Sequence, residues 1–141
     1  MNIKNLSALF VISLGLGSFG AAAANLTIDM TGIKELKGQL LVAVYDSAES
    51  MASGSNAFNR QIIKVNKSEH SLTLNDVPAG EYGVMVFQDL NGDNKLGRNF
   101  VGIPSEPYGF STNPNLMGAP EFKDIAFAVG SDDSRIQISL E

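Results

Sequence analysis

The chain of 141 residues has no cysteine and no tryptophan, and it has a single histidine. Without cysteine it can form neither disulfides nor a sulfur-linked lipid anchor, so its stability must come from a buried core. Zinc sites draw mainly on cysteine and histidine, and a zinc centre is therefore not expected. A cysteine nucleophile is excluded, and no segment resembles the nucleophile elbow of the serine hydrolases.

Basic side chains are also scarce. Ten lysines and arginines stand against fifteen acidic residues, which gives a net charge of −5. An acidic surface repels phosphate groups, so nucleic acid and anionic lipid are not expected as partners. The same surface is compatible with the binding of cations.

The N-terminus has the features of a targeting segment. Lys4 precedes an apolar stretch over residues 6–20, and "AAAA" (21–24) supplies the small residues that signal peptidase recognises. The apolar stretch is short for a membrane span and is not followed by basic residues. We expect a cleaved signal peptide over 1–24, a single domain over 25–141, no membrane span after cleavage, and a periplasmic or secreted protein.

Short apolar stretches separated by turn residues predict a β-rich domain. The expected strands cover residues 26–30, 39–45, 60–66, 70–77, 81–89, 125–130 and 135–140. Residues 46–58 have low strand propensity and could hold one helical turn. This pattern predicts an all-β fold: a single antiparallel β-sandwich of about seven strands, immunoglobulin-like or transthyretin-like, with one long ordered loop.

The stretch "NDVPAGEY" (75–82) has a structural meaning. Pro78 and Gly80 form a tight turn, and Tyr82 follows two residues after the glycine. This spacing predicts a tyrosine corner, in which the phenol donates a hydrogen bond back to the backbone across the turn.

Residues 89–124 form the long loop, which is rich in glycine, proline and asparagine. Loops longer than about 12–15 residues are uncommon in small domains and are usually functional or disordered. This one carries many apolar residues, which favours a loop packed on the sandwich. We expect residues 89–122 to form the functional surface.

The stretch "DLNGDNKLG" (89–97) spaces oxygen ligands as a calcium loop does. The candidate metal ligands are Asp89, Asn91, Asp93 and, through its backbone carbonyl, Lys95. The bidentate glutamate that should follow at position twelve is replaced by Phe100, although Glu106 could close the loop from further along. The other interpretation is a polar turn, because Asn-Gly favours hairpins and Asp and Asn side chains cap their own backbone.

The stretch "GIPSEPYGFSTN" (102–113) is the candidate ligand site. Its prolines stiffen the backbone, and Gly102 and Gly109 permit unusual dihedral angles. The side chains that could line a pocket are Glu106, Tyr108, Phe110 and Ser111. In the alternative interpretation the aromatic residues complete the core and Glu106 binds a backbone amide. His70, at the start of a strand, is expected to be solvated.

Several of these motifs together resemble a known family. They are "PAGEY", the run from Asp89 to Leu96, "NFVGIPSEPYGFS" and "GAPEFKDIAF". The chain resembles the exported bacterial family called domain of unknown function 2141 over nearly all of the predicted domain. The resemblance implies a secreted or periplasmic β-sandwich and brings no activity with it. Members commonly carry an acidic residue where this chain has Gly97, so one possible metal ligand is missing.

Three functions are compatible with the sequence. The first is an exported, non-catalytic binding or scaffold module, without a cofactor, whose partner is a protein or small molecule of the cell envelope. The second is an envelope or adhesion module that calcium stabilises through residues 89–97. The third is a small hydrolase-like enzyme with Glu106 as general base.

Overall fold

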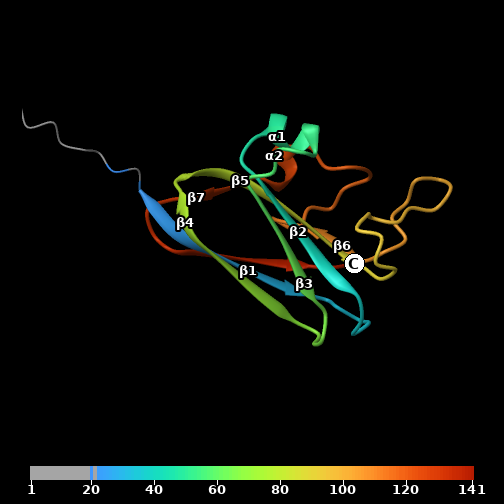
Figure 1. Cartoon of the computed structure of the whole chain (residues 1–141). Coiled ribbons are helices and arrows are strands. Elements are labelled where there is room, and N and C mark those ends of the chain that lie inside the picture. The colour runs from blue at the N-terminus through green and yellow to red at the C-terminus, as the bar shows by residue number, and fades with distance from the viewer. Residues whose placement is uncertain (1–19, 21) are drawn as a thin grey trace, which may run out of the picture.

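Two β-sheets packed face to face form the fold of this computed structural model, which describes Gly20 and residues 22–141 (Figure 1). The elements follow in the order β1 (Ala23–Thr31), β2 (Gln39–Tyr45), α1 (Ala48–Ser53), β3 (Asn59–Lys64), β4 (His70–Pro78), β5 (Gly80–Asp89), β6 (Tyr108–Phe110), α2 (Phe122–Ile125), β7 (Phe127–Val129) and β8 (Ser134–Ser139). One sheet has the order β4-β1-β8 and the other β3-β2-β5-β6. Strand β7 pairs with the first residues of β5. The prediction of an all-β sandwich is confirmed.

The core lies between the sheets and follows from period-two alternation. On β1, Leu26, Ile28 and Met30 are fully buried, and the residues between them are partly exposed. Strand β2 buries Leu40 and Val42 in the same way. Successive side chains of a strand point to opposite faces, so each strand contributes every second residue to the core.

One strand pair departs from the expected antiparallel arrangement. Strands β1 and β8 run parallel, with Ile28 opposite Ile136 and Met30 opposite Ile138. The other strand pairs of the described residues are antiparallel. The two strands come from opposite ends of the described chain, so no short hairpin turn forces them to run in opposite directions.

Of the two segments that hold helices, one agrees with the prediction and one differs from it. The helical turn expected in 46–58 is present as α1, where the Ser47 hydroxyl accepts a hydrogen bond from the Ser50 amide. Ile125, predicted to begin a strand, instead ends helix α2. A capping box between Glu121 and Asp124 starts that helix, and such a local pairing favours the helix over an extended chain.

The long loop is not continuous, which corrects its predicted extent of 89–124. Strand β6 interrupts it and pairs with β5, placing Tyr108 opposite Phe87 and Phe110 opposite Met85. Gly109, between them, packs so closely on β8 that a Cβ atom would lie 2.7 Å from Ile138 Cγ2. Gly109 therefore serves close packing, whereas Gly102 does have the positive φ expected of it (84°).

The N-terminal prediction falls largely outside the described residues. Of the predicted signal peptide, only Gly20 and residues 22–24 are described, and Ala23 and Ala24 are the first residues of β1. Ala24 is buried and lies opposite Val77 of β4. Cleavage after Ala24 would remove the start of this strand.

The expectation of a solvated histidine is wrong. His70 begins β4 and is only 8% exposed. Burial, together with the nearby charge of Lys67, lowers the pKa of its imidazole. The neutral ring is thus the form that the fold favours.

The tyrosine corner is present. The Tyr82 hydroxyl donates a 2.8 Å hydrogen bond to the Pro78 carbonyl, and its ring packs edge-on against Phe58. Tyr82 is only 4% exposed. If this hydrogen bond were broken, water could therefore not fully replace the carbonyl as the partner of the hydroxyl. The bond fixes the turn that carries the chain from β4 into β5.

Removing this hydroxyl tests the corner. Tyr82→Phe should lower the free energy of unfolding by about 1 kcal/mol, because the Pro78 carbonyl loses its buried donor. Urea unfolding measures the loss. Tyr45→Phe is the matched control, since Tyr45 is also buried and no hydrogen bond of its hydroxyl is found among the described residues. Equal losses in the two variants would contradict a special role for the corner.

Candidate functional site

The long loop begins at a buried carboxylate. Asp89 is the last residue of β5 and is fully buried. Its Oδ1 accepts a hydrogen bond from the Gly92 amide (2.8 Å), and its Oδ2 accepts from the Asn94 amide (2.9 Å) and from Gln39 Nε2 (3.1 Å). Burial opposes ionisation, but these hydrogen bonds outweigh it and lower the pKa of Asp89.

In the next turns of the loop, side-chain oxygens also accept hydrogen bonds from backbone amides, at the two-residue spacing seen in the sequence. Asn91 Oδ1 accepts from the Asp93 amide (3.1 Å), and Asp93 Oδ1 accepts from the Lys95 amide (2.9 Å). Asn94 adopts the left-handed conformation with a φ of 58°. Residues 89–95 thus form the capped polar turn that was one of the two sequence interpretations.

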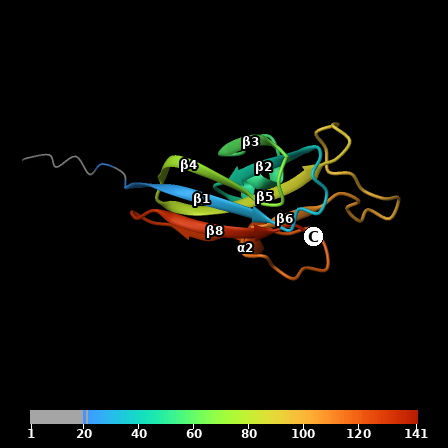
Figure 2. The same ribbon diagram turned by 90° about the horizontal axis from the view of Figure 1, so that it is seen from below.

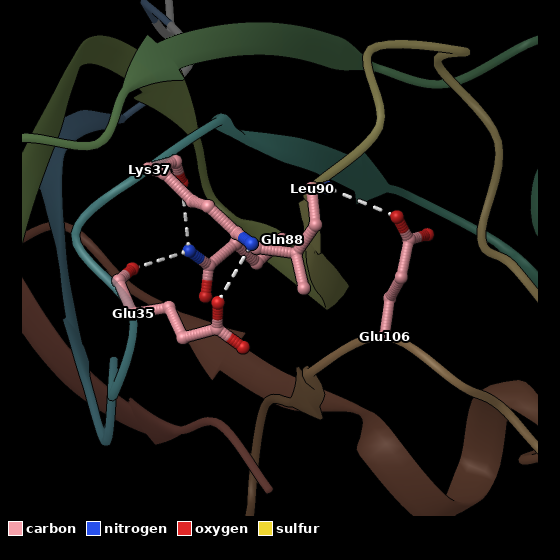
Figure 3. Close-up of polar contacts among 5 residues, drawn as sticks. All are labelled: Glu35, Lys37, Gln88, Leu90 and Glu106. Atoms are coloured by element: carbon pink, nitrogen blue, oxygen red, sulfur yellow. Dashed lines mark hydrogen bonds and ion pairs between the residues drawn. The ribbon is translucent and has the colours of Figure 1, made fainter.

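Glu106 closes the loop from its far side. Its Oε1 accepts from the Leu90 amide (2.9 Å, Figure 3). Its Oε2 accepts from the Gly97 amide (2.8 Å), so one buried carboxylate ties the loop at two points. A Cβ atom at position 97 would lie 2.8 Å from Ser105 Oγ. Glycine at this position therefore lets the Glu106 segment come close.

Three carboxylates meet where these turns converge. Oxygen atoms of Asp89, Asp93 and Glu106 all lie within 4.8 Å of one another. Asp89 and Glu106 are buried, and Asp93 is exposed. Of the predicted metal ligands, the structure therefore joins two with Glu106, which the sequence had offered only as a possible closing group. We call these three residues the acidic cluster.

The acidic cluster has the chemistry of a hard-cation site. Each carboxylate oxygen can accept about two hydrogen bonds or ligands, and Asp89 Oδ1 and both Glu106 oxygens accept one backbone amide each. These three oxygens retain capacity for a cation, whereas Asp89 Oδ2 is already shared between two donors. Oxygen ligands of this kind suit calcium.

Beyond the acidic cluster, the chain folds into a small hairpin over residues 97–105. The Ser105 amide donates to the Gly97 carbonyl, and the Asn99 amide donates to the Ile103 carbonyl. The Asn99 side chain accepts from the backbone of Val101 and Ile103 (3.0 Å each), which holds the tip. The loop extends past the end of the sheets, near the C-terminus (Figure 2).

A cavity of about 580 Å³ lies between this hairpin, the segment 116–120 and the outer face of the five-stranded sheet. Its sheet side is formed by Tyr45, Met85, Tyr108 and Phe110, and the hairpin contributes Leu96, Arg98, Val101 and Ile103. The outer face of β5 and β6 is therefore apolar as well as the inner one. A cavity of this size is within the range of small-molecule sites.

The predicted ligand residues divide into two pairs. Tyr108 and Phe110 line the cavity, with ring centroids 5.5 Å apart. Ser111 does not, because its hydroxyl is fully buried, accepts from the Val84 amide and donates to the Ile125 carbonyl. Glu106 is also absent from the lining and belongs to the acidic cluster. The side chains of Ser111 and Glu106 hold the loop and do not line the cavity.

Sequence reasoning missed Tyr45 and Met85, which form the sheet side of the cavity together with the predicted Tyr108 and Phe110. Met85 and Phe87 alternate along β5 with the buried Val84 and Val86, a continuous apolar run typical of a strand covered on both faces. That run was a usable signal that something packs on the outer face. Arg98 carried no such signal, because its position depends on how the hairpin folds.

The low pKa of Asp89 gives a pH-dependent prediction. At neutral pH, Asp89→Asn should lower the free energy of unfolding by about 2 kcal/mol, because the loop amides lose a charged acceptor. In the unfolded chain Asp89 takes up its proton near the ordinary pKa of 3.8, and in the folded chain only below it. The stabilisation by the Asp89 carboxylate is therefore complete above the unfolded pKa of 3.8. It is lost as the pH falls through the folded pKa of Asp89.

Urea unfolding of the wild type and the variant between pH 7 and pH 3 measures this effect. The difference between the two should shrink as the pH falls below about 4. Asp132→Asn, an exposed aspartate between β7 and β8, is the control and should change little. A difference that stays constant over the whole range would contradict the assigned role of Asp89.

Among the described residues, no helix is long and apolar enough to cross a membrane. Searches of curated proteins and of solved structures found no significant match. A family model described as "Uncharacterized protein conserved in bacteria (DUF2141)" matches residues 28–137, which include most of both sheets, the acidic cluster and the cavity. The chain therefore belongs to the bacterial family called domain of unknown function 2141.

Proposed function

We propose that the protein is an exported, non-catalytic binding module that holds a small ligand with an apolar body in the cavity between its long loop and the outer face of β5 and β6. The observation that carries this proposal is the cavity itself, of about 580 Å³ and lined mainly by apolar side chains. Rigid strands supply its base, and a loop tied down by Glu106 supplies its cover.

The exposure of the cavity's apolar groups supports an occupant. Val101 and Ile103 are 64% and 60% exposed, and Met117 is fully exposed, although all three line the cavity. Apolar side chains that gather in this way on the surface of a protein commonly mark a binding site. A ligand in the cavity would remove part of this area from water.

A catalytic role has weaker support. The hydrolase alternative needs Glu106 to reach a substrate as general base, yet both its oxygens accept backbone amides and it does not line the cavity. His70, the single histidine, lies on the other sheet. We therefore favour binding over catalysis. The apolar segment at the N-terminus favours a periplasmic or secreted location. The expected partner is then a small molecule or protein of the cell envelope.

A neutral fluorescent probe tests the cavity. N-phenyl-1-naphthylamine brightens in apolar surroundings and should bind the purified protein. Ile103→Asn should weaken binding by about 1 kcal/mol, close to fivefold, because apolar contact area is lost. Ile62→Asn is the matched control, since Ile62 is equally exposed (61%) but lies outside the cavity. No binding to the wild type, or equal losses in both variants, would overturn the proposal.

The acidic cluster supports a second function, stabilisation by calcium. Three carboxylates within 4.8 Å repel one another when ionised, and a divalent cation would relieve this repulsion. We propose that Asp89, Asp93 and Glu106 hold the ion, with Asn91 and the carbonyl of Lys95 completing the coordination. Such an ion would stiffen the loop that covers the cavity, as expected of an envelope or adhesion module.

Thermal unfolding in EDTA and in calcium tests this second proposal. A ligand at 100 times its dissociation constant stabilises by about 2.7 kcal/mol, which should raise the midpoint by about 10 °C for a domain of this size. Asp93→Asn should abolish the rise without disturbing the fold, because Asn can still accept from the Lys95 amide. An unchanged midpoint in the wild type, or a full rise in Asp93→Asn, would contradict the calcium site.

A further inference from the structure

Arg98 is the one charged side chain among the described residues that line the cavity, which are mainly apolar. Tyr45 and Tyr108 add polar hydroxyl groups to the lining. The protein as a whole has a net charge of −5, so its overall field repels anions. A single arginine beside apolar walls makes the local electrostatic potential positive.

Arg98 is held in place but keeps donors to spare. Its Nη1 donates a 2.9 Å hydrogen bond to the Gly102 carbonyl, which anchors the guanidinium to the tip of the hairpin. A guanidinium has five N–H donors, and no other side-chain hydrogen bond of Arg98 is found in the described part of the chain. The remaining donors can form a paired contact with a carboxylate, sulfonate or phosphate.

A second, smaller cavity adjoins the first and carries the opposite charge. It has a volume of about 160 Å³ and shares Tyr108, Phe110, Leu116 and Gly118 with the larger cavity. The charged side chain in its lining is that of Glu141. An anionic group would be repelled there and attracted to the Arg98 end.

We infer that the ligand of the large cavity is a small amphiphile with an apolar body and a single anionic group, whose anionic group pairs with Arg98. This inference rests on the proposed function, since it names the chemical class bound in the same cavity. The apolar body lies over Met85, Tyr108 and Phe110 of the sheet. The anionic group lies at the hairpin, where Arg98 and solvent share its charge.

Two related probes separate the anionic group from the apolar body. 8-Anilinonaphthalene-1-sulfonate carries a sulfonate, and N-phenyl-1-naphthylamine has nearly the same aromatic body without it. We expect Arg98→Met to raise the dissociation constant of the sulfonate probe by about fivefold, as for a partly exposed ion pair at low salt. The neutral probe should change little. Salt should weaken binding of the sulfonate probe alone.

Two further variants make the test specific. Arg98→Lys keeps the charge and should retain most of the affinity for the sulfonate probe. Lys64→Met removes an equal charge from β3, outside the cavity, and should leave both probes unaffected. Equal affinity of the wild type and Arg98→Met for the sulfonate probe would overturn the inference. So would loss of both probes in Arg98→Met, because Arg98 would then act only by holding Gly102.

The same titrations distinguish failure of the anionic-ligand inference from failure of the proposed function. If the neutral probe binds the wild type and Arg98→Met alike, and so does the sulfonate probe, the cavity stands as a binding site and only the anionic class is wrong. If neither probe binds the wild type, the proposed function itself fails.

Discussion

The burial of one carboxylate at the end of β5 governs the loop that follows it. Asp89 has no exposed surface, so its charge has to be satisfied by protein donors. The amides of Gly92 and Asn94 can reach it only if the chain turns back at once. Gln39 of the neighbouring strand adds a third donor and joins this turn to the sheet. The loop therefore leaves the sandwich in a fixed direction.

Glu106 gives the loop its second fixed point. One oxygen accepts from Leu90, at the start of the loop (Figure 3), and the other accepts from Gly97, where the hairpin begins. A loop fastened at these positions returns beside β5, and strand β6 can then pair with that strand. The cavity is a consequence of this geometry, because residues of the hairpin between Gly97 and Ser105 form one of its walls and residues of β5 and β6 form another.

The acidic cluster and the cavity thus both depend on the same loop, the one that follows β5. The carboxylates that fasten the loop also create the concentration of negative charge that calcium would relieve, and the fastened loop carries Arg98 to the cavity. If an ion binds at Asp89, Asp93 and Glu106, it would stabilise the loop that forms one wall of the cavity. The proposed cation binding and the proposed ligand binding would then be coupled through the stiffness of the loop that both sites share.

The sequence by itself determined the local features. Alternation of apolar residues specified the core strands such as β1, the spacing of Pro78 and Tyr82 specified the corner, and the spacing of Asp89, Asn91 and Asp93 specified the capped turns. Each of these depends on residues a few positions apart. Only the tertiary structure decided that β1 and β8 run parallel, that Glu106 joins the acidic cluster, that Ser111 is buried and that Arg98 lines a cavity. These placements depend on contacts between residues distant in the chain, and the spacing of residues along a sequence carries no information about which distant segments meet.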